Sequence, residues 1–377
     1  MNHRLRRGTR KLAIFVTLAF LATGGYALKG LGRSHDDAFS KEGLLVATAD
    51  QLKSTVITAH LEEPIKPGQS VLWCSTLQLA WNEACALIGE DIHLQKDPPL
   101  VAFLNKKTAT KKDLDDASYV ALAGFVRDRI YARIDAELKR KFKGEATPRY
   151  NKPMGAVRPQ DFVAYGYLFK NLEFATPFQR LDAPLVFRGT RVACFGIEGD
   201  SPKHGPLYRQ LIVLDYKSSD DFVIELKTKS EGDRFILAKV APASDLRGTI
   251  EAVQARVAKA SPDPLPGGVV LKVPKLNFDF TREYRELYGQ KLNVANPKVA
   301  KDIEILTAVQ NIRCQLDEKG VRLRSESHVS FGCAIVPPPP HRLIFDKPFL
   351  MLLQRADAKR PYFALWVETP EVLLATK

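Results

Sequence analysis

The side chains best suited to chemistry, five cysteines and seven histidines, are scattered along the chain. The cysteines lie at positions 74, 85, 194, 314 and 333, and the histidines at 3, 35, 60, 93, 204, 328 and 341. They form no Cys-x-x-Cys pair and no Cys/His spacing typical of zinc, which argues against a metal site. The sequence also lacks a Gly-x-Ser-x-Gly turn, a phosphate-binding glycine loop and a His-Glu-x-x-His motif.

The sequence therefore predicts no catalytic residue, no metal and no cofactor, and a protein that is not an enzyme. A catalytic triad dispersed along the chain would carry no local pattern. An extracytoplasmic hydrolase thus stays open as the third choice.

A basic cluster offers a candidate binding site for a polyanion. It consists of Lys139, Arg140, Lys141 and Lys143. Such a cluster would bind through salt-sensitive contacts. The simpler interpretation is the solvated end of a helix, where cations suit the negative end of the helix dipole.

The charge of the whole chain says little about nucleic acid. The formal net charge is +13, but residues 1–33 hold seven Lys or Arg and no acid, which leaves +6 for the rest. A nucleic-acid-binding protein would concentrate its cations on the folded part. Hydrophobic residues make up 45% and charged residues 26%, as in an ordinary globular protein. We therefore expect no nucleic-acid partner.

The N-terminal segment has the pattern of a targeting sequence. Five cations between Arg4 and Lys11 precede an uncharged, mostly apolar run at 12–28. This pattern predicts a signal peptide or a signal anchor at 1–28, and both stay open. A buried core helix is the less favoured alternative. The chain is then exported, either secreted, periplasmic or membrane-anchored, and touches the membrane only through this segment.

Beyond the N-terminus the sequence predicts a tether at 29–43 and one domain at 44–371. Helices are expected at 75–88, ended by Gly89, at 116–142, and at 245–259, capped by Ser244. Strands are expected at 161–169, 185–197, 209–216, 221–227, 233–240, 268–280, 309–316, 321–331, 348–354 and 361–367. The fold class is α+β, with N-terminal helices followed by large mixed or antiparallel sheets.

Three stretches, in order, resemble serpins, the serine protease inhibitor family. Residues 167–178, with Phe169-Lys170-Asn171, resemble the family's strand ending in Phe-Lys-Gly and the nearby Trp-x-x-Pro-Phe. Residues 312–320, ending in Glu318-Lys319-Gly320, resemble the strand and Glu-x-Gly hinge that open the reactive loop. Residues 343–350 and 361–367 resemble the closing pair of strands. The resemblance covers roughly 44–371 and implies a divergent member with a serpin-like fold.

The chain departs from the family at the polar lock of the main sheet. Cys74-Ser75 replaces the family's Ser-Pro, Gln310 falls at its histidine, and its paired asparagine falls near Tyr165. These differences place the lock in doubt.

The resemblance implies a function for the segment after Gly320. In an inhibitory serpin a protease cuts the exposed loop, and the N-terminal arm of the loop then inserts into the main sheet as a new strand. The family favours small residues after the hinge glycine, whereas here Val321-Arg322-Leu323-Arg324 is bulky and charged. The hinge residues are Glu318, Gly320, Val321 and Leu323.

The arm has the alternation of a half-buried strand. Val321, Leu323, Ser325, Ser327, Val329 and Phe331 share one face. We therefore expect a β-hairpin over 309–331, with a four-residue loop at 317–320 and a positive φ at Gly320. With 321–331 already in the sheet, the protein would be non-inhibitory, with a binding or structural role.

The alternative is a protease inhibitor with an exposed reactive loop. The usual family spacing from Gly320 places the cut bond near Ala334-Ile335, beside Cys333. The expected partner is then a protease, and otherwise another protein; the oligomeric state has no signal in the sequence.

Overall fold

The structure is a computed structural model that describes residues 41–143, 146, 158–199, 201, 204–260, 268–297, 299, 302–322 and 341–376. The predicted targeting segment at 1–28 and most of the tether lie outside the described residues. Within the described part of the chain, no helix is long and apolar enough to cross a membrane.

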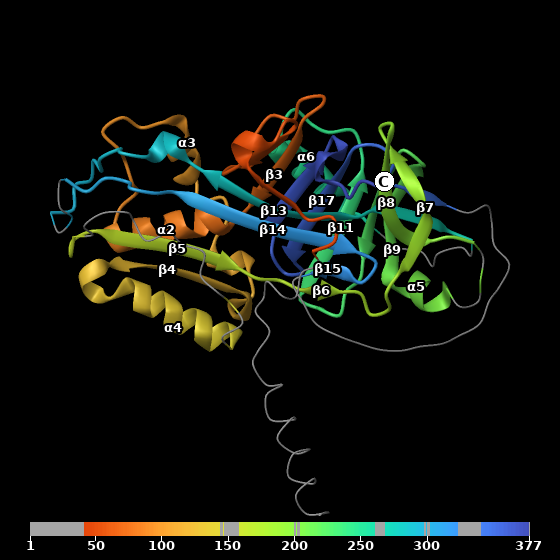
Figure 1. Cartoon of the computed structure of the whole chain (residues 1–377), viewed down its shortest axis with the longest axis horizontal. Helices are drawn as coiled ribbons and strands as arrows, with labels where there is room; N and C mark the ends of the chain where they lie inside the picture. The colour runs from red at the N-terminus through yellow and green to blue at the C-terminus, as the bar shows by residue number, and fades with distance from the viewer. Residues whose placement is uncertain are drawn as a thin grey trace, which may run out of the picture.

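A seven-stranded sheet forms the centre of the molecule (Figure 1). Its strands, in spatial order, are β2 (Thr55–Thr58), β3 (Ser70–Cys74), β18 (Pro361–Val367), β17 (Phe349–Arg355), β11 (Asp233–Lys239), β10 (Asp221–Leu226) and β9 (Leu211–Ser218). All pairs are antiparallel except β2 with β3. Every residue of β18 is buried because the sheet is covered on both faces. Phe363 and Leu365 face the main core, and Trp366 faces the helix α6 (Leu246–Ala258).

The N-terminus of α6 differs by one residue from the prediction. Asp245, not Ser244, is the N-cap, and its carboxylate accepts a hydrogen bond from the backbone N–H of Gly248 at 2.7 Å. The Ser244 carbonyl is instead bonded to the N–H of Ile65 at 3.1 Å. Aspartate suits the cap because its charge also favours the positive end of the helix.

Two further sheets flank the central one. The five-stranded sheet contains β1 (Leu45–Thr48), β13 (Leu276–Glu283), β14 (Val309–Asp317), β15 (Gly320–Arg322) and β6 (Leu172–Glu173). The four-stranded sheet contains β16 (Arg342–Ile344), β12 (Val270–Pro274), β8 (Thr190–Ile197) and β7 (Gln179–Phe187). Both sheets are mixed, since β1 is parallel to β13 and β12 to β16. The predicted α+β class with large mixed sheets is confirmed.

A smaller layer contains two strands between two helices. The strands are β4 (Tyr119–Phe125) and β5 (Phe162–Leu168), and the helices are α2 (Thr76–Ile88) and α4 (Ile130–Phe142) (Figure 1). The predicted helix at 75–88 is confirmed, and Gly89 ends it with a φ of 87°. The remaining short elements are α3 (Pro99–Leu104), α5 (Gly205–Gln210), η2 (Ala49–Gln51), η3 (Lys111–Asp113), η7 (Arg285–Leu287) and η8 (Pro370–Val372).

The prediction of one helix over 116–142 is wrong in its first half. The chain there forms η4 (Asp116–Ser118), β4 and η5 (Val126–Asp128) before α4 begins. Side chains of β4 alternate: Val120 packs toward α4, and Ala121 packs into the main core. Pairing with β5 along all seven residues satisfies the backbone of β4, which favours the strand over the helix.

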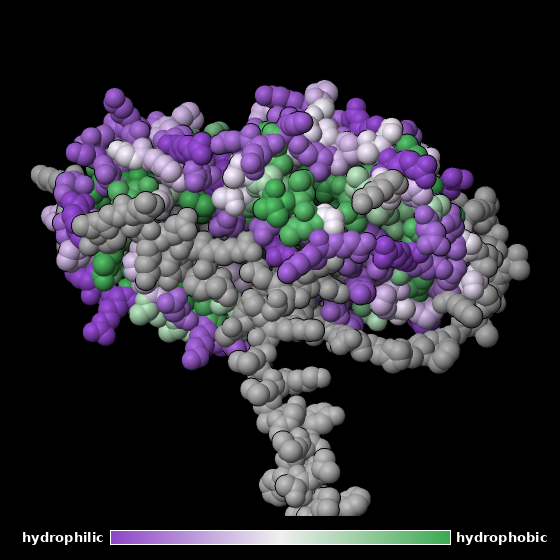
Figure 2. Space-filling model, in the orientation of Figure 1, coloured by the Kyte–Doolittle hydropathy of each residue, from purple (hydrophilic) through white to green (hydrophobic). Residues whose placement is uncertain are grey.

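The described cysteines and tryptophans fill the core. Four cysteines, at 74, 85, 194 and 314, are buried and free, while Cys333 lies outside the described residues. The three tryptophans, at 73, 81 and 366, are at most 7% exposed. Figure 2 shows hydrophilic residues over most of one face, with apolar residues gathered near its centre.

Candidate functional site

The hinge corner consists of the end of β14, the turn at Glu318 and Lys319, β15 and β6. Leu316 pairs with Val321 and Asp317 with Gly320, so β15 returns antiparallel along β14. The predicted hairpin is thus confirmed for 309–322, and residues 323–331 lie outside the described residues. The loop has two residues rather than the four predicted, because Asp317 and Gly320 already pair.

Gly320 is required at the corner by its backbone. Its φ is 141°, which side chains rarely adopt, and this agrees with the predicted positive φ. A Cβ at this position would lie 2.5 Å from the carbonyl oxygen of Leu172 and 2.7 Å from the Cα of Glu173. Only glycine therefore lets β15 pair with β6.

Glu318 anchors the turn to the neighbouring sheet. Its carboxylate accepts a hydrogen bond from Lys275, the residue that joins β12 to β13. Their side chains are only 17% and 7% exposed. Burial alone would raise the pKa of Glu318, but the hydrogen bond from Lys275 and a backbone hydrogen bond outweigh it, so the pKa lies below its ordinary value.

This pKa shift predicts acid-sensitive stability. A carboxylate with a lowered folded-state pKa stabilises the fold above its unfolded pKa, and the stabilisation is lost as the pH falls through the folded-state pKa. We expect Glu318→Gln to lower the free energy of unfolding by about 1 kcal/mol at pH 7, and this difference should shrink steadily as the pH falls below the ordinary glutamate pKa of about 4.3. Urea unfolding across this pH range measures the difference.

The exposed ion pair of Glu198 with Lys272 provides the control. Glu198 is 48% exposed, so water screens the pair. Glu198→Gln should change the unfolding free energy by less than about 0.5 kcal/mol at pH 7. Equal losses from Glu318→Gln and Glu198→Gln would show that the turn is not anchored by Glu318.

The remaining residues of the predicted hinge and loop divide between described and undescribed segments. Val321 is 1% exposed and packs in the core with Leu172 and Leu316. Leu323 and the predicted reactive-loop residues Cys333, Ala334 and Ile335 lie outside the described residues.

β14 and β5 present two strand edges toward each other on either side of the start of α2. Thr76 contacts both strands: its hydroxyl bonds Gln310 of β14 at 2.8 Å, and its carbonyl lies against Gly166 of β5. β14 and β5 run in the same direction (Figure 1). Of the described strands, only β15 pairs with β14 on this side, through residues 315–317, and none pairs with the facing edge of β5.

Gln310 forms a buried polar junction at the position where the sequence places the lock in doubt. Its side-chain oxygen accepts from the Tyr284 hydroxyl at 2.8 Å, and its amide nitrogen donates to the Cys74 carbonyl at 3.0 Å. Burial raises the pKa of Tyr284, which keeps the donor protonated. Tyr165 packs toward α4 on the other face of β5. The glutamine thus ties β14 to the end of β3, to the start of α2 and to Tyr284 directly after β13.

A buried ion pair beside the hinge corner was missed in the sequence. Lys170, between β5 and β6, lies 2.8 Å from Asp233 of β11, and both side chains are at most 6% exposed. The hydroxyls of Tyr362 and Ser230 also donate to the Asp233 carboxylate, at 3.0 and 2.8 Å. Lys170 belongs to the first serpin-like stretch, but its partner is 63 residues away in the sequence. The network joins the segment before β6 to the central sheet.

The predicted polyanion patch lies on the last turn of α4. Arg140 donates to Glu137, and Lys141 donates to Asp116 and is only 10% exposed. These pairs neutralise two of the four cations within the chain. Lys139 is exposed, and Lys143 follows the helix as its C-cap.

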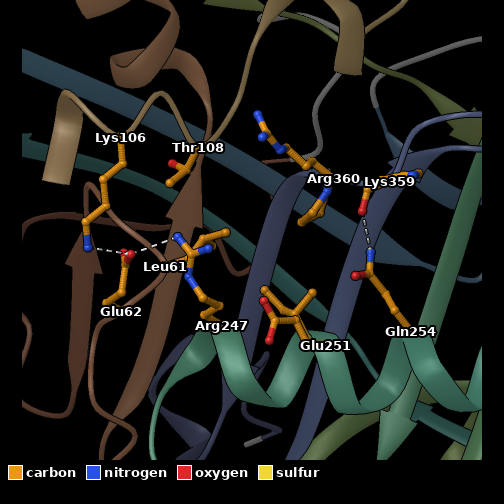
Figure 3. Close-up of a pocket in the computed structure, with 11 residues that line it drawn as sticks. Leu61, Glu62, Lys106, Thr108, Arg247, Glu251, Gln254, Lys359 and Arg360 are labelled. Atoms are coloured by element: carbon orange, nitrogen blue, oxygen red, sulfur yellow. Dashed lines mark hydrogen bonds and ion pairs between the residues drawn. The ribbon is translucent and has the colours of Figure 1, made fainter.

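A pocket with a volume of about 510 Å³ lies beside α6, which we name the α6 pocket (Figure 3). Leu61, Ile250 and Pro361 supply apolar walls. Its basic lining residues are Lys106, Arg247, Lys359 and Arg360, and its acidic ones are Glu62 and Glu251. These residues come from separate segments of the chain, so no local sequence pattern pointed to them.

Glu62 links two of these cations at one wall of the pocket. One carboxylate oxygen of Glu62 accepts from Lys106 at 3.0 Å and from Arg247 at 2.8 Å (Figure 3). Lys359 and Arg360 have no ion pair with any described residue; the Arg360 guanidinium donates to the carbonyl of Lys107 at 3.0 Å. The lining of the α6 pocket therefore carries more positive than negative charge. Across the described part of the chain, no group of three or more His, Cys, Asp or Glu could hold a metal ion.

No protein-family model matches the chain, and no curated protein matches it. Similar solved structures include Serpin48 of the insect Tenebrio molitor, described as highly specific, with a TM-score of 0.40, 14% identity, and coverage of 81% of this chain and 92% of that one. A serpin from Schistosoma mansoni has a TM-score of 0.40 and 13% identity, with coverage of 64% of this chain and 65% of that one. Human thyroxine-binding globulin, in a complex with its hormone, has a TM-score of 0.36 and 14% identity, with coverage of 64% of each chain.

The structures that the chain resembles are serpins, the family indicated by the three sequence stretches. The likeness concerns the fold, and TM-scores of this size carry no argument about a site or an activity.

Proposed function

We propose that this chain is a non-inhibitory serpin-like protein with a binding or structural role. In this proposal residues 321–331 already form a strand of the five-stranded sheet, which corresponds to the main sheet of serpins. The observation that carries the proposal is that β15 pairs on both sides, Val321 with Leu316 of β14 and with Leu172 of β6. A strand bonded on both edges has no unused backbone pairing that later insertion would gain.

The register of β15 supports a longer strand. Extending the pairing Leu316–Val321 would set Leu323 opposite Cys314 and Ser325 opposite Ile312. Extending the pairing with β6 would set Ser327 opposite Gly166, where α2 leaves least room. The predicted alternation of side chains along 321–331 places the small Ser325 and Ser327 at these inward positions and the charged Arg324 and Glu326 outward. Val321, which the structure describes, is buried and so has the inward orientation that this alternation requires.

A single cysteine tests the proposed strand. Leu323→Cys, in a Cys333→Ser background, would face the native Cys314 across an antiparallel pair, at a separation that suits a disulfide. Expression in an oxidising compartment should give a disulfide between Cys314 and the cysteine introduced at position 323, found by mass spectrometry of the digested protein. Burial raises the pKa of Cys314, so the bond should form during folding rather than by later oxidation.

The matched control is Arg324→Cys in the same background. Its side chain would point to the other face, so it should form no disulfide and should react with a maleimide. An introduced thiol at position 323 that reacts fully with maleimide in the folded protein would overturn the proposed strand. The alternative would then be a protease inhibitor cut near Ala334-Ile335, which an elastase-like protease would reveal as a detergent-resistant complex.

The α6 pocket favours a second candidate function, the binding of a small organic anion. Its four basic and two acidic lining residues leave an excess of positive charge beside the apolar Leu61, Ile250 and Pro361. An anion with an apolar body, such as 8-anilinonaphthalene-1-sulfonate, matches both features. The double variant Lys359→Gln/Arg360→Gln should weaken binding of this dye by at least about fivefold in fluorescence titration. Lys112→Gln, at an exposed lysine outside the pocket lining, should not.

The proposal includes export by the N-terminal segment. Residues 1–28 would direct the domain out of the cytoplasm, either released or held at a membrane by this segment alone. Sequencing the N-terminus of the mature protein distinguishes the two: a new terminus close to Ala27 shows cleavage, and an intact Met1 end in the membrane fraction shows an anchor. Protein confined to the cytoplasm would contradict export.

A further inference from the structure

His60 lies directly behind the pocket wall that Glu62 forms. Its ring stacks on Phe103 of α3, with centroids 3.9 Å apart and an interplanar angle of 14°. Its Nδ1 lies 3.8 Å from Glu62, and its Nε2 lies 3.8 Å from Glu63. The side chain is 15% exposed. Both ring nitrogens of this partly buried histidine are thus faced by carboxylates, at distances slightly too long for hydrogen bonds.

Two atoms between His60 and Glu62 are buried without a hydrogen-bond partner. They are the Nδ1 atom of His60 and the Oε2 atom of Glu62, which face each other across the 3.8 Å gap. Buried polar atoms usually have partners, so an unsatisfied pair of this kind needs an explanation. The other oxygen of Glu62 is already bonded by Lys106 and Arg247. Glu62 is therefore shared between the pocket on one side and His60 on the other.

The environment of His60 favours the neutral ring at neutral pH. Burial is the main cause that lowers its pKa; Glu63 and Glu62 raise it, while Arg282 of β13 and Lys106 after α3 lower it. Acidification then places a third cation beside the single carboxylate of Glu62. The gap to Oε2 is short enough to close into a charge-assisted hydrogen bond. Glu62 must then divide its charge among three donors.

We propose that His60 makes the α6 pocket proton-sensitive: a proton on the imidazole draws Glu62 toward His60 and away from Arg247, which leaves this guanidinium free for an anionic ligand. This inference rests on the proposed binding of an anion in the α6 pocket. Linkage requires the converse as well, so an anion in the pocket should favour protonation of His60.

The test is fluorescence titration of the full chain with 8-anilinonaphthalene-1-sulfonate at pH 7.5 and pH 5.5. The wild type should bind about three- to tenfold more tightly at pH 5.5. In His60→Gln the ratio should fall to about one. Glu62→Gln should bind more tightly than wild type at pH 7.5 and show little pH dependence, because its Arg247 is released at both pH values.

The control is His93→Gln, which removes a histidine that is 56% exposed and pairs with Asp97. It should keep the pH ratio of the wild type. A ratio that persists in His60→Gln would overturn the role of His60 while leaving the pocket intact. If Lys359→Gln/Arg360→Gln does not weaken dye binding, the pocket itself is not the binding site, and the inference falls with it. Near-ultraviolet circular dichroism at pH 5.5 confirms that each variant is folded during the titration.

Discussion

Replacing Lys170 by methionine is expected to lower the free energy of unfolding by about 3–5 kcal/mol. The substitution leaves the Asp233 carboxylate buried, with only the neutral hydroxyls of Tyr362 and Ser230 as donors. Charge burial without a cationic partner is among the most destabilising changes in a core. Urea unfolding at pH 7 measures the loss, and it should appear as a shift of the midpoint.

The double variant Lys170→Met/Asp233→Asn separates the charge effect from packing. The asparagine still offers an oxygen to Tyr362 and an amide to Ser230, but no charge remains to be desolvated. We expect it to recover most of the stability lost in Lys170→Met. If the double variant is as unstable as the single one, packing of the lysine stem rather than its charge holds this junction.

Replacing Gly166 by alanine should cost at least about 2 kcal/mol. The added Cβ would lie against the carbonyl oxygen of Thr76 more closely than any real Cβ contact. The Thr76 oxygen belongs to the backbone and the added Cβ is bonded directly to it at position 166, so neither can rotate away. Either β5 or the first turn of α2 must therefore move. The same movement would disturb Gln310, which bonds Thr76 from β14. Thermal and urea unfolding both measure the effect.

Gly232 provides a matched glycine-to-alanine control. It lies just before β11, no heavy atom lies within 4 Å of the position that a Cβ would occupy, and its φ is in the ordinary range. Gly232→Ala should therefore be neutral or stabilise by up to about 1 kcal/mol, through lower entropy of the unfolded chain. Equal effects of the two substitutions would show that the contact between β5 and α2 is not close.

Local patterns in the sequence were sufficient for some elements. The single strands predicted at 185–197 and 268–280 are wrong, because the first is divided by a turn with positive φ at Arg188 and Gly189, and the second covers β12 and most of β13. The apolar stripe of 75–88 and the glycine after it predicted α2 correctly. The alternation of 309–316 and the glycine at 320 predicted the hairpin. These two predictions are correct because the side chains that determine each element are close together in the sequence. The region 116–142 failed because β4 is specified by its pairing with β5, about 40 residues away, which outweighs helical spacing in the local sequence.

The site was only partly predictable for the same reason. Glu318, Gly320 and Val321 could be named as hinge residues from the sequence because they lie within one motif. Their structural partners lie in segments that only the fold brings near: Lys275 for Glu318, Glu173 for Gly320 and Leu172 for Val321. Gln310 was seen as a departure from the serpin pattern, but its three hydrogen bonds, to Tyr284, Cys74 and Thr76, could not be read from the local sequence. The α6 pocket had no sequence signal.

A thermal melt before and after a single cut tests the proposed strand most directly. A site-specific protease sequence placed at 333–336 would allow the chain to be nicked beyond the arm. If 321–331 are already in the sheet, the melting temperature should change by less than about 4 °C, since cutting releases nothing to insert. A rise of more than about 10 °C would correspond to the new hydrogen bonds and burial of an inserted strand, and would contradict the account.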